Sequence, residues 1–284
     1  MSFVTRFAPS PTGPLHLGHA YSAVLAHDTA QAAGGTFLLR IDDLDQTRCK
    51  PQWEAQIFDD LAWLGLTWPQ PVLRQSTRLP RYRDALQTLW DQGLLYPCSC
   101  SRADIRAAAS APQEGAPLHG PDGVIYPGTC RPETPPSAPM PDMPLRLDMA
   151  RALGRLDTPL SFTETGSGPG GETGVIRPEN MQAHVGDVAL ARPGMDASYH
   201  LSVVLDDADQ KITHVIRGQD LFSATQIHVL LQRLLGLPTP IYHHHRLIRD
   251  ETGKRLAKRD DARAIATYRA EACSPQDIRL MIGL

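Results

Sequence analysis

Apolar residues form short bounded runs along the first third of the chain, and amphipathic stretches separate them. Residues 2–7, rich in Val, Phe and Thr, predict a strand, and residues 15–33, rich in Ala and Leu without a proline, predict a buried helix. The apolar run 36–41 predicts a buried parallel strand. Residues 52–64 and 78–95 place apolar side chains at helical spacing. These elements predict an α/β fold.

The second half of the chain repeats this alternation. Residues 199–205 predict a strand, and residues 212–216 predict another that carries Arg217 at its carboxyl end. Residues 220–235 predict a long helix with an apolar face. Residues 239–248 predict a strand containing three consecutive histidines, which cannot all converge on a metal because neighbouring side chains on a strand point to opposite faces.

A turn rich in proline and glycine, residues 9–14, separates the first strand from the first helix. His16, Gly18 and His19 therefore fall in the first turns of that helix, where unpaired N–H groups and the helix dipole favour phosphate. Gly18 lets a flat ring or a sugar approach the backbone. The two histidines share one helical face and suit transfer at an α-phosphate, where charge builds on oxygen. A pair of ordinary, partly buried histidines is the alternative.

Charged side chains follow two of the predicted strands. Residues 42–45 place three aspartates at the carboxyl end of a strand, where ligands bind in open α/β sheets. Arg217 precedes a glycine at the end of another strand, and its planar fork could grip a carboxylate. The alternative for Arg217 is a salt bridge to Asp206 or Asp220.

Several motifs together resemble one family. Residues 6–19 (Arg-Phe-Ala-Pro-Ser-Pro-Thr-Gly-Pro-Leu-His-Leu-Gly-His) are similar to the ATP-binding signature of class I aminoacyl-tRNA synthetases, in its glutamyl form. Residues 255–259 (Arg-Leu-Ala-Lys-Arg) resemble the second, basic signature of that class, and residues 40–45 and 214–221 are also similar. The resemblance implies an α/β fold: a Rossmann-type class I synthetase catalytic domain with a zinc-containing α/β insertion and a short C-terminal helical stub.

The resemblance also implies how the chain is divided. We expect the first half of the Rossmann catalytic domain at 1–95, a zinc-binding, acceptor-contacting insertion at 96–185 and the second half of the catalytic domain at 186–236. The basic signature loop and the helical stub, one or two short helices, would occupy 237–284. The chain ends soon after the second signature and leaves no room for an anticodon-binding domain, which most resembles the glutamyl-queuosine tRNA(Asp) synthetases, short paralogues of glutamyl-tRNA synthetases.

Site residues follow from the resemblance. Such an enzyme activates L-glutamate with ATP and Mg²⁺ and passes it to a tRNA, here tRNA(Asp) carrying queuosine. The catalytic residues would be His16, His19 and Lys258, and ATP would contact His16, Gly18, His19, Arg255 and Lys258. Glutamate would be bound by Arg6, Phe7, Ala8, Pro9, Ser10, Asp42, Tyr199 and Arg217. The sequence departs from the family at Asp42, where the family has glutamate, at Arg255, where lysine is common, and at Ala257, where serine is common.

A proline-rich region contains three of the five cysteines. Ten of the 25 prolines fall between residues 112 and 144; Cys98 and Cys100 precede them, and Cys130 lies among them. An odd cysteine count in a long chain argues against a disulfide framework. The spacing leaves a structural zinc site and plain reduced cysteines equally open, with His119 or Tyr126 as fourth ligand. The family resemblance favours one zinc ion on Cys98, Cys100, Tyr126 and Cys130. The glycine-rich run 163–174 lacks a P-loop lysine and predicts a flexible turn.

Composition narrows the setting without deciding the function. The 284 residues are 42% hydrophobic and 21% charged, which is ordinary for a globular protein. No leader and no apolar stretch of spanning length is visible, so we expect a cytoplasmic monomer without a membrane partner. The net charge of −3 neither favours nor excludes nucleic acid, although residues 246–263 form a local basic segment. A minimal glutamyl-tRNA synthetase and a non-catalytic tRNA- or glutamate-binding module remain alternatives.

Overall fold

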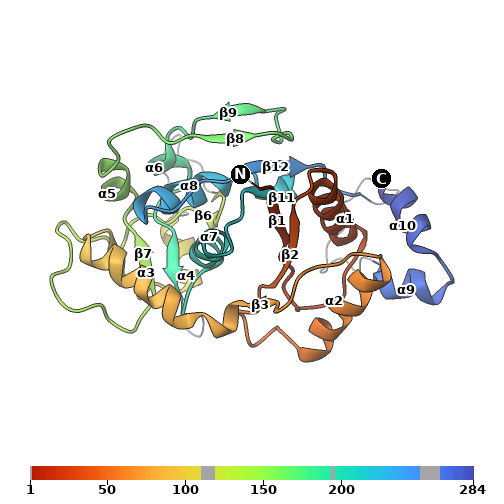
Figure 1. Cartoon of the computed structure of the whole chain (residues 1–284). Helices are drawn as coiled ribbons and strands as arrows, with labels where there is room; N and C mark the ends of the chain where they lie inside the picture. Colours follow the sequence, from red (N-terminus) through yellow and green to blue (C-terminus); the bar gives the residue numbers. More distant parts are fainter. Residues whose placement is uncertain (1, 110–118, 193–195, 250–262) are drawn as a thin grey trace.

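Figure 1 shows the computed structural model, which describes residues 2–109, 119–192, 196–249 and 263–284. Lys258 and Arg255 lie outside these described residues, as does Ala257. The strands are β1 (Val4–Phe7), β2 (Thr36–Ile41), β3 (Leu73–Arg74), β4 (Leu95–Pro97), β5 (His119–Gly120), β6 (Gly123–Val124), β7 (Leu145–Leu147), β8 (Phe162–Glu164), β9 (Gly174–Ile176), β10 (Ala189–Ala191), β11 (His214–Gly218) and β12 (Ile241–His245).

Helices alternate with these strands over much of the chain. The α-helices are α1 (Leu17–Ala32), α2 (Pro51–Trp63), α3 (Leu79–Asp91), α4 (Arg102–Ala109), α5 (Met149–Gly154), α6 (Met181–His184), α7 (Tyr199–Asp209), α8 (Thr225–Leu234), α9 (Ile265–Ala270) and α10 (Pro275–Ile282). Two 3₁₀ turns, η1 (Gln75–Thr77) and η2 (Gln219–Leu221), complete the described elements. None of the described helices has the length and apolar character needed to cross a membrane.

Parallel strands lie at the centre of the molecule. Strands β1, β2 and β3 pair in parallel, as do β11, β12 and β8. The backbone N–H of Thr213 donates to the carbonyl of Val4 (2.9 Å), which places β11 beside β1. The carboxyl ends of β1, β2, β11 and β12 therefore face the same edge, the place where open α/β sheets bind ligands. The strands predicted at 2–7, 36–41, 212–216 and 239–248 are confirmed.

Helix α1 starts after the turn at residues 9–14, as the sequence predicted, and it packs on β1, β2 and β11. It ends where Gly34 adopts a positive φ of 59°, a conformation open to glycine. Gly35 is required for a different reason, because a Cβ there would lie 2.2 Å from the carbonyl oxygen of Phe3. The short helix α10 lies beside α1, and Arg279 pairs with Asp28 across that contact. Helix α9 lies beside α2, where Arg269 pairs with Asp59.

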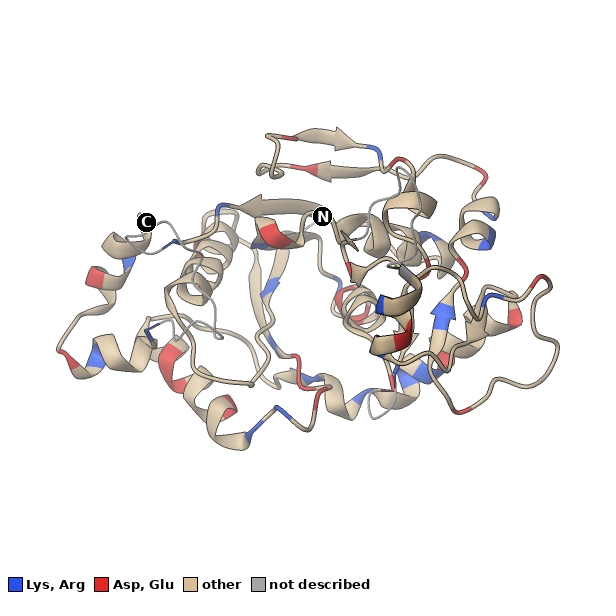
Figure 2. Cartoon of the chain, turned by 180° about the vertical axis from the view of Figure 1, so that it is seen from behind, with Lys and Arg blue, Asp and Glu red and all other residues tan. Residues whose placement is uncertain are grey.

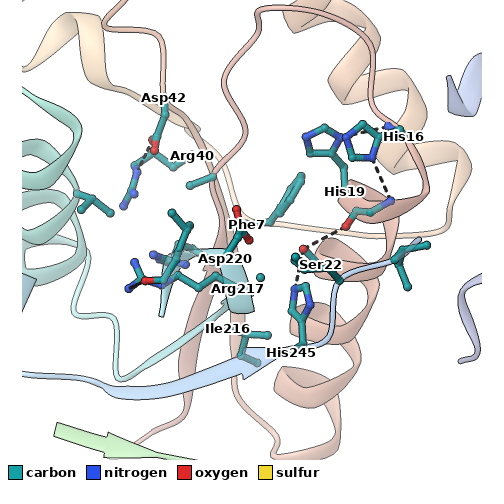
Figure 3. A pocket seen from close by; sticks show the side chains of 18 of the residues that line it. Phe7, His16, His19, Ser22, Arg40, Asp42, Ile216, Arg217, Asp220 and His245 are labelled. Atoms are coloured by element: carbon teal, nitrogen blue, oxygen red, sulfur yellow. Dashed lines mark hydrogen bonds and ion pairs between the residues drawn. The ribbon is translucent and has the colours of Figure 1, made fainter. Parts of the chain in front are cut away.

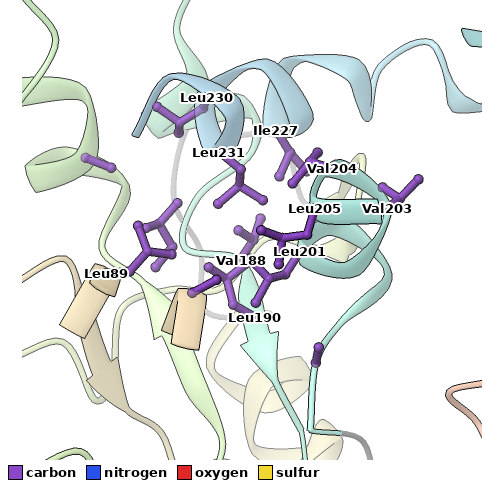
Figure 4. Packing of buried hydrophobic residues seen from close by; sticks show 14 of the residues in the cluster. Leu89, Val188, Leu190, Leu201, Val203, Val204, Leu205, Ile227, Leu230 and Leu231 are labelled. Carbon is purple, nitrogen blue, oxygen red and sulfur yellow. The ribbon is translucent and has the colours of Figure 1, made fainter. Parts of the chain in front are cut away.

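The strand predicted at residues 199–205 is wrong, because this segment forms helix α7. Its valines favour strands, and every residue from 200 to 207 is buried, so no polar face marks the helical period. Leu201 and Leu205 belong to the same buried cluster as Ile227 and Leu231 of α8 (Figure 4). The predicted helix 220–235 is present as η2 followed by α8.

The glycine-rich run at 163–174 forms a turn between two strands, as predicted. It connects β8 and β9, which pair antiparallel, and β8 extends the main sheet by pairing with β12. A Cβ on Gly166 would lie 2.2 Å from the carbonyl oxygen of His244, so this glycine allows the close approach of the two segments. The boundary at residue 185, between the insertion and the second half of the catalytic domain, stays a prediction.

Two smaller sheets form the region after α3. Strands β4, β7 and β10 make an antiparallel sheet, and β5 pairs with β6 in a two-stranded hairpin. A small buried cluster of Tyr96, Cys98 and Tyr126 lies in this region. Basic and acidic residues are interspersed over the described elements (Figure 2), in line with the small net charge.

Candidate active site

A cavity of about 350 Å³ lies at the carboxyl ends of β1, β2, β11 and β12, beside the start of α1 (Figure 3). Nine predicted site residues line it: Arg6, Phe7, Ala8, His16, Gly18, His19, Asp42, Tyr199 and Arg217. Pro9 and Ser10 are not among its described lining residues. Figure 3 shows the two histidines on one side of the cavity and Arg217 on the other.

His16 and His19 cap the start of α1 reciprocally. The Nδ1 atom of His16 accepts from the backbone N–H of Gly18 (3.1 Å), and Nδ1 of His19 accepts from the backbone N–H of His16 (3.2 Å). A ring nitrogen that accepts carries no proton, so each neutral ring carries its proton on Nε2. The two rings are in contact, with centroids 3.8 Å apart and a tilt of 40° between their planes. The start of α1 thus holds two Nε2–H donors in one place, which suits an anionic ligand.

Gly18 makes this arrangement possible. A Cβ at this position would lie 3.0 Å from Cε1 and 3.1 Å from Nδ1 of His16, so any larger residue would displace the imidazole. One N–H group of the helix start, that of Gly18, is already occupied by His16.

A buried ionic network lies under the cavity floor. Arg6 donates to both carboxylate oxygens of Asp207 through Nε (2.9 Å) and Nη2 (3.1 Å). Arg40 donates to Asp207 (2.6 Å) and, through Nε, to Asp42 (2.8 Å). Because Arg6 already holds a carboxylate of the protein, its fork is engaged before any substrate binds. Burial is tolerated here because each charge has a partner.

Asp42 is the acidic group of this network that faces the cavity. Burial raises the pKa of its carboxyl to about 6, although the nearby Arg40 guanidinium acts in the opposite direction. Asp42 is therefore ionised at neutral pH and becomes protonated in mildly acidic solution. Asp43 instead accepts hydrogen bonds from the backbone N–H and hydroxyl of Ser76, and Asp45 pairs with Arg48 near the surface.

Arg217 is held by neutral groups. Its Nε donates to His244 (3.0 Å), and its Nη1 lies within hydrogen-bond distance of His228 (3.1 Å) and Tyr199 (3.4 Å). Its Nη2 donates to Thr225 (2.8 Å). In the described part of the chain Arg217 forms no ion pair, so the alternative of a salt bridge to Asp206 or Asp220 is not found.

Two of the three consecutive histidines contribute to the site in different ways. His244 lies 2.5 Å from Glu164 through Nδ1, a buried contact that orients its ring toward Arg217. His245 lies 2.7 Å from the hydroxyl of Ser22 on α1 and lines the cavity. The three histidines diverge, as the strand alternation predicts.

Three polar residues of the cavity have weak or no signals in the sequence. Ser22 and His245 meet only because β12 returns beside α1. Arg40 carries a weak signal, because a charged residue within an otherwise apolar strand needs buried partners. One partner, Asp42, is two positions away, but the other, Asp207, lies 167 positions away and cannot be deduced from the pattern.

Three cysteines form a second site, away from the cavity. The sulfurs of Cys98, Cys100 and Cys130 all lie within 4.8 Å of one another. The hydroxyl of Tyr126 lies 3.5 Å from the sulfurs of Cys98 and Cys100 and accepts from the backbone N–H of Cys130 (2.7 Å). His119 is not part of the group, so Tyr126 is the better fourth ligand.

The spacing of this cysteine cluster fits a tetrahedral metal ion. Two sulfurs about 2.3 Å from zinc stand about 3.8 Å apart, and those of Cys100 and Cys130 are 3.4 Å apart. Hydrogen bonding, led by that from Tyr126, lowers the pKa of Cys130 to about 7. Arg146 donates to Cys98 (3.2 Å) and lies over the Tyr126 ring, so a cation also supports thiolate character. The cluster could therefore bind a metal such as zinc.

Comparison with known proteins agrees with this geometry. The family model described as tRNA synthetases class I (E and Q), catalytic domain, matches residues 2–119 and 174–284. The chain belongs to this class I tRNA synthetase family. It is 65% identical over 283 residues to a protein of Rhodobacter capsulatus named glutamyl-Q tRNA(Asp) synthetase, covering 99% of this chain and all of that protein. A protein of the same name from Symbiobacterium thermophilum is 40% identical, covering 96% of this chain and 83% of the relative.

A solved synthetase structure extends the comparison. A glutamate tRNA ligase from Elizabethkingia meningosepticum, solved in complex with its amino acid, matches with a TM-score of 0.70 and 29% identity. The match covers 92% of this chain and 52% of that one, so the chain spans about half the length of this structure. The expected fold, a Rossmann-type class I synthetase catalytic domain with short C-terminal helices, is confirmed.

Proposed function

We propose that the chain activates L-glutamate with ATP to glutamyl-adenylate and transfers the glutamyl group to the queuosine base of tRNA(Asp). One observation carries the proposal: a single cavity is lined both by the paired histidines at the start of α1 and by the guanidinium of Arg217. The full-length similarity to proteins named glutamyl-Q tRNA(Asp) synthetase supports the choice of acceptor. A cytoplasmic location is part of the same proposal, because the proposed substrate is a tRNA.

The first step is an in-line displacement at phosphorus. An oxygen of the glutamate α-carboxylate attacks the α-phosphorus of ATP, and the bond to the β-phosphate breaks to release pyrophosphate. Nε2–H groups of His16 and His19 donate to the phosphate oxygens as charge develops on them. Mg²⁺ accompanies ATP as the counter-charge of its phosphates.

The basic segment 255–259 would bind the β- and γ-phosphates through Arg255 and Lys258. The described residues on either side of this segment support the role, because Ile248 lines the cavity and Ala264 forms a β-bridge with His16.

Glutamate would lie between Arg217 and Asp42. Arg217 and Tyr199 would hold the side-chain carboxylate, and the ionised Asp42 would hold the α-ammonium group. Asp42 is one methylene shorter than the glutamate common in the family, and its carboxylate is held by a hydrogen bond from Nε of Arg40 (2.8 Å). Arg6, Phe7, Ala8, Pro9 and Ser10 would form the adjoining wall, with Arg6 acting through its pair with Asp207.

The cysteine cluster would hold one structural zinc ion. Cys98 and Cys100 follow β4, and Tyr126 and Cys130 follow β6, so a zinc ion would join two short segments that bury little apolar surface of their own.

Charging three tRNAs with labelled glutamate tests the proposal. Queuosine-containing tRNA(Asp) should accept glutamate, whereas tRNA(Asp) with guanosine at the same position and tRNA(Glu) should not. Charging of tRNA(Glu) instead would favour a minimal glutamyl-tRNA synthetase, which the likeness to a glutamate tRNA ligase keeps open. Glutamate-dependent pyrophosphate exchange without tRNA, abolished by Lys258→Ala, should accompany the expected result. Absence of exchange under all conditions would contradict the proposal.

A further inference from the structure

Two buried histidines behind the cavity have no part in the reaction as proposed. His200 on α7 is 6% exposed, and His228 on α8 is 1% exposed. Nδ1 of His200 lies 3.2 Å from Nε2 of His228, and the ring of Tyr199 packs on both. Burying two imidazoles side by side costs free energy unless their ring nitrogens form hydrogen bonds. The partners of each ring nitrogen therefore indicate what the pair does.

The partners of these rings fix the position of every proton. A guanidinium can only donate, so the contact of Arg217 Nη1 with Nδ1 of His228 (3.1 Å) makes that nitrogen an acceptor and leaves the proton on Nε2. This proton is donated to Nδ1 of His200, which must carry its own proton on Nε2. Nε2 of His200 lies 3.3 Å from the carboxylate of Asp122, which accepts it. The four residues form one chain of hydrogen bonds with a single direction.

Asp122 anchors the chain at its outer end. It lies between β5 and β6, its side chain is 26% exposed, and it also pairs with Arg192. Although burial acts to raise it, the pKa of Asp122 is held below its usual range by the hydrogen bond from His200 and the charges nearby. Burial also lowers the pKa of His228 well below its usual value, which keeps that ring neutral. Hydrogen bonds that all donate in one direction thus connect Arg217, at the cavity, to Asp122 in the cysteine-containing region.

Arg217 is supported from its other side in the same way. Its Nε donates to His244, whose second nitrogen lies 2.5 Å from Glu164. On both sides of Arg217 the hydrogen bonds end at a carboxylate, Asp122 or Glu164, but the group in contact with the guanidinium is a neutral imidazole ring. A carboxylate in direct contact would compete with a substrate carboxylate, whereas a neutral acceptor orients the fork and leaves its charge available.

We propose that His228 and His200, anchored by Asp122, are positioning residues that fix the guanidinium of Arg217 for binding the side-chain carboxylate of glutamate. The inference rests on the proposed function, which assigns Arg217 to glutamate. It adds that the affinity for glutamate depends on a hydrogen-bond chain that begins between β5 and β6.

Kinetics of glutamate-dependent pyrophosphate exchange test the positioning role. His228→Leu removes the acceptor and should raise the KM for glutamate about tenfold, with the KM for ATP unchanged and kcat less affected. His228→Gln keeps one acceptor and one donor and should recover most of the affinity. Asp122→Asn should raise the KM for glutamate about threefold. His214→Gln is the matched control and should behave as wild type. His214 is half-buried and stacks on Phe3, and it takes no part in the hydrogen-bond chain from Arg217 to Asp122.

Nitrogen-15 NMR of the histidine rings tests the chain without any turnover. In the ligand-free wild-type protein both His200 and His228 should show the Nε2–H form, and Asp122→Asn should alter the His200 signals. A ring of either histidine in the Nδ1–H form, or a His228→Leu enzyme with the wild-type KM for glutamate, would overturn the proposal. Failure of the wild-type protein to activate glutamate would refute the proposed function instead. The NMR spectra would still decide whether the hydrogen bonds from Arg217 through His228 and His200 to Asp122 are formed.

Discussion

Replacing Asp42 by asparagine removes the negative charge that should attract the glutamate ammonium group. Asparagine keeps an oxygen that can accept from Nε of Arg40, so the cavity should retain its shape. A hydrogen bond to a charged group contributes about 1.5–3 kcal/mol, which corresponds to a loss of glutamate affinity of about 10- to 100-fold at pH 7.5. The affinity for ATP should change little.

The raised pKa of Asp42 predicts how this effect depends on pH. With a pKa of about 6, the carboxylate is ionised at pH 7.5 and mostly protonated at pH 5. Wild-type affinity for glutamate should therefore be constant above pH 7 and fall toward tenfold per pH unit well below 6. The Asp42→Asn protein should bind glutamate weakly and without this pH dependence.

Stability should respond to the same ionisation in the opposite sense. Because the pKa of Asp42 in the folded protein, about 6, lies above its usual value of 3.8, the folded state holds the proton more tightly. The stability linked to this group is fully present below pH 3.8 and is lost as the pH rises through 6. The loss is about 3 kcal/mol. Relative to wild type, Asp42→Asn should gain about that much in unfolding free energy between pH 4 and pH 7.

Calorimetric titration of glutamate from pH 5 to 8.5, together with urea unfolding from pH 4 to 8.5, measures both effects. Asp45→Asn is the matched control, since its carboxyl is near the surface and hydrogen bonds from Thr47 and Arg48 lower its pKa to about 2. An Asp42→Asn protein with wild-type affinity and the wild-type pH profile would refute the assignment of Asp42 to the ammonium group.

Three further substitutions test other parts of the structure. Gly18→Ala should displace the His16 ring and slow pyrophosphate exchange about 100-fold, while the melting temperature stays within a few degrees; an unaltered rate would show that the ring position is unimportant. Cys100→Ser should lower the zinc content measured by mass spectrometry and increase proteolysis near the cluster, and a metal-free wild-type protein would end that prediction. Asp207→Asn should cost about 3–5 kcal/mol in urea unfolding because two buried arginines lose their shared carboxylate, whereas the exposed Asp59→Asn should cost under about 1 kcal/mol; equal losses would contradict the network.

Local sequence patterns predict an element when it has one polar and one apolar face, or when turn residues mark its ends. Helix α3 has a polar and an apolar face, and the strand at 36–41 is bounded by glycines and aspartates, so both are visible in the sequence. The segment at 199–205 is not, because helix α7 is buried on all sides and its valines suggest a strand. Here burial among other elements, which the sequence does not display, overrides local propensity.

The candidate site divides in the same way. Gly18 and the two histidines beside it could be predicted because they are close in sequence and their spacing places them on one helical turn. Contacts between distant segments could not: the carboxylate that holds Arg6 lies 201 positions further along the chain. The chain from Arg217 through His228 to His200 likewise exists only because α7 packs on α8 beside β11.

A crystal structure with a non-hydrolysable analogue of glutamyl-adenylate would show whether one cavity binds both halves of the intermediate. The phosphate should lie against Nε2 of His16 and His19, and the glutamate side-chain carboxylate should lie on Arg217. An analogue bound outside this cavity, with both histidines and Arg217 untouched, would contradict this placement.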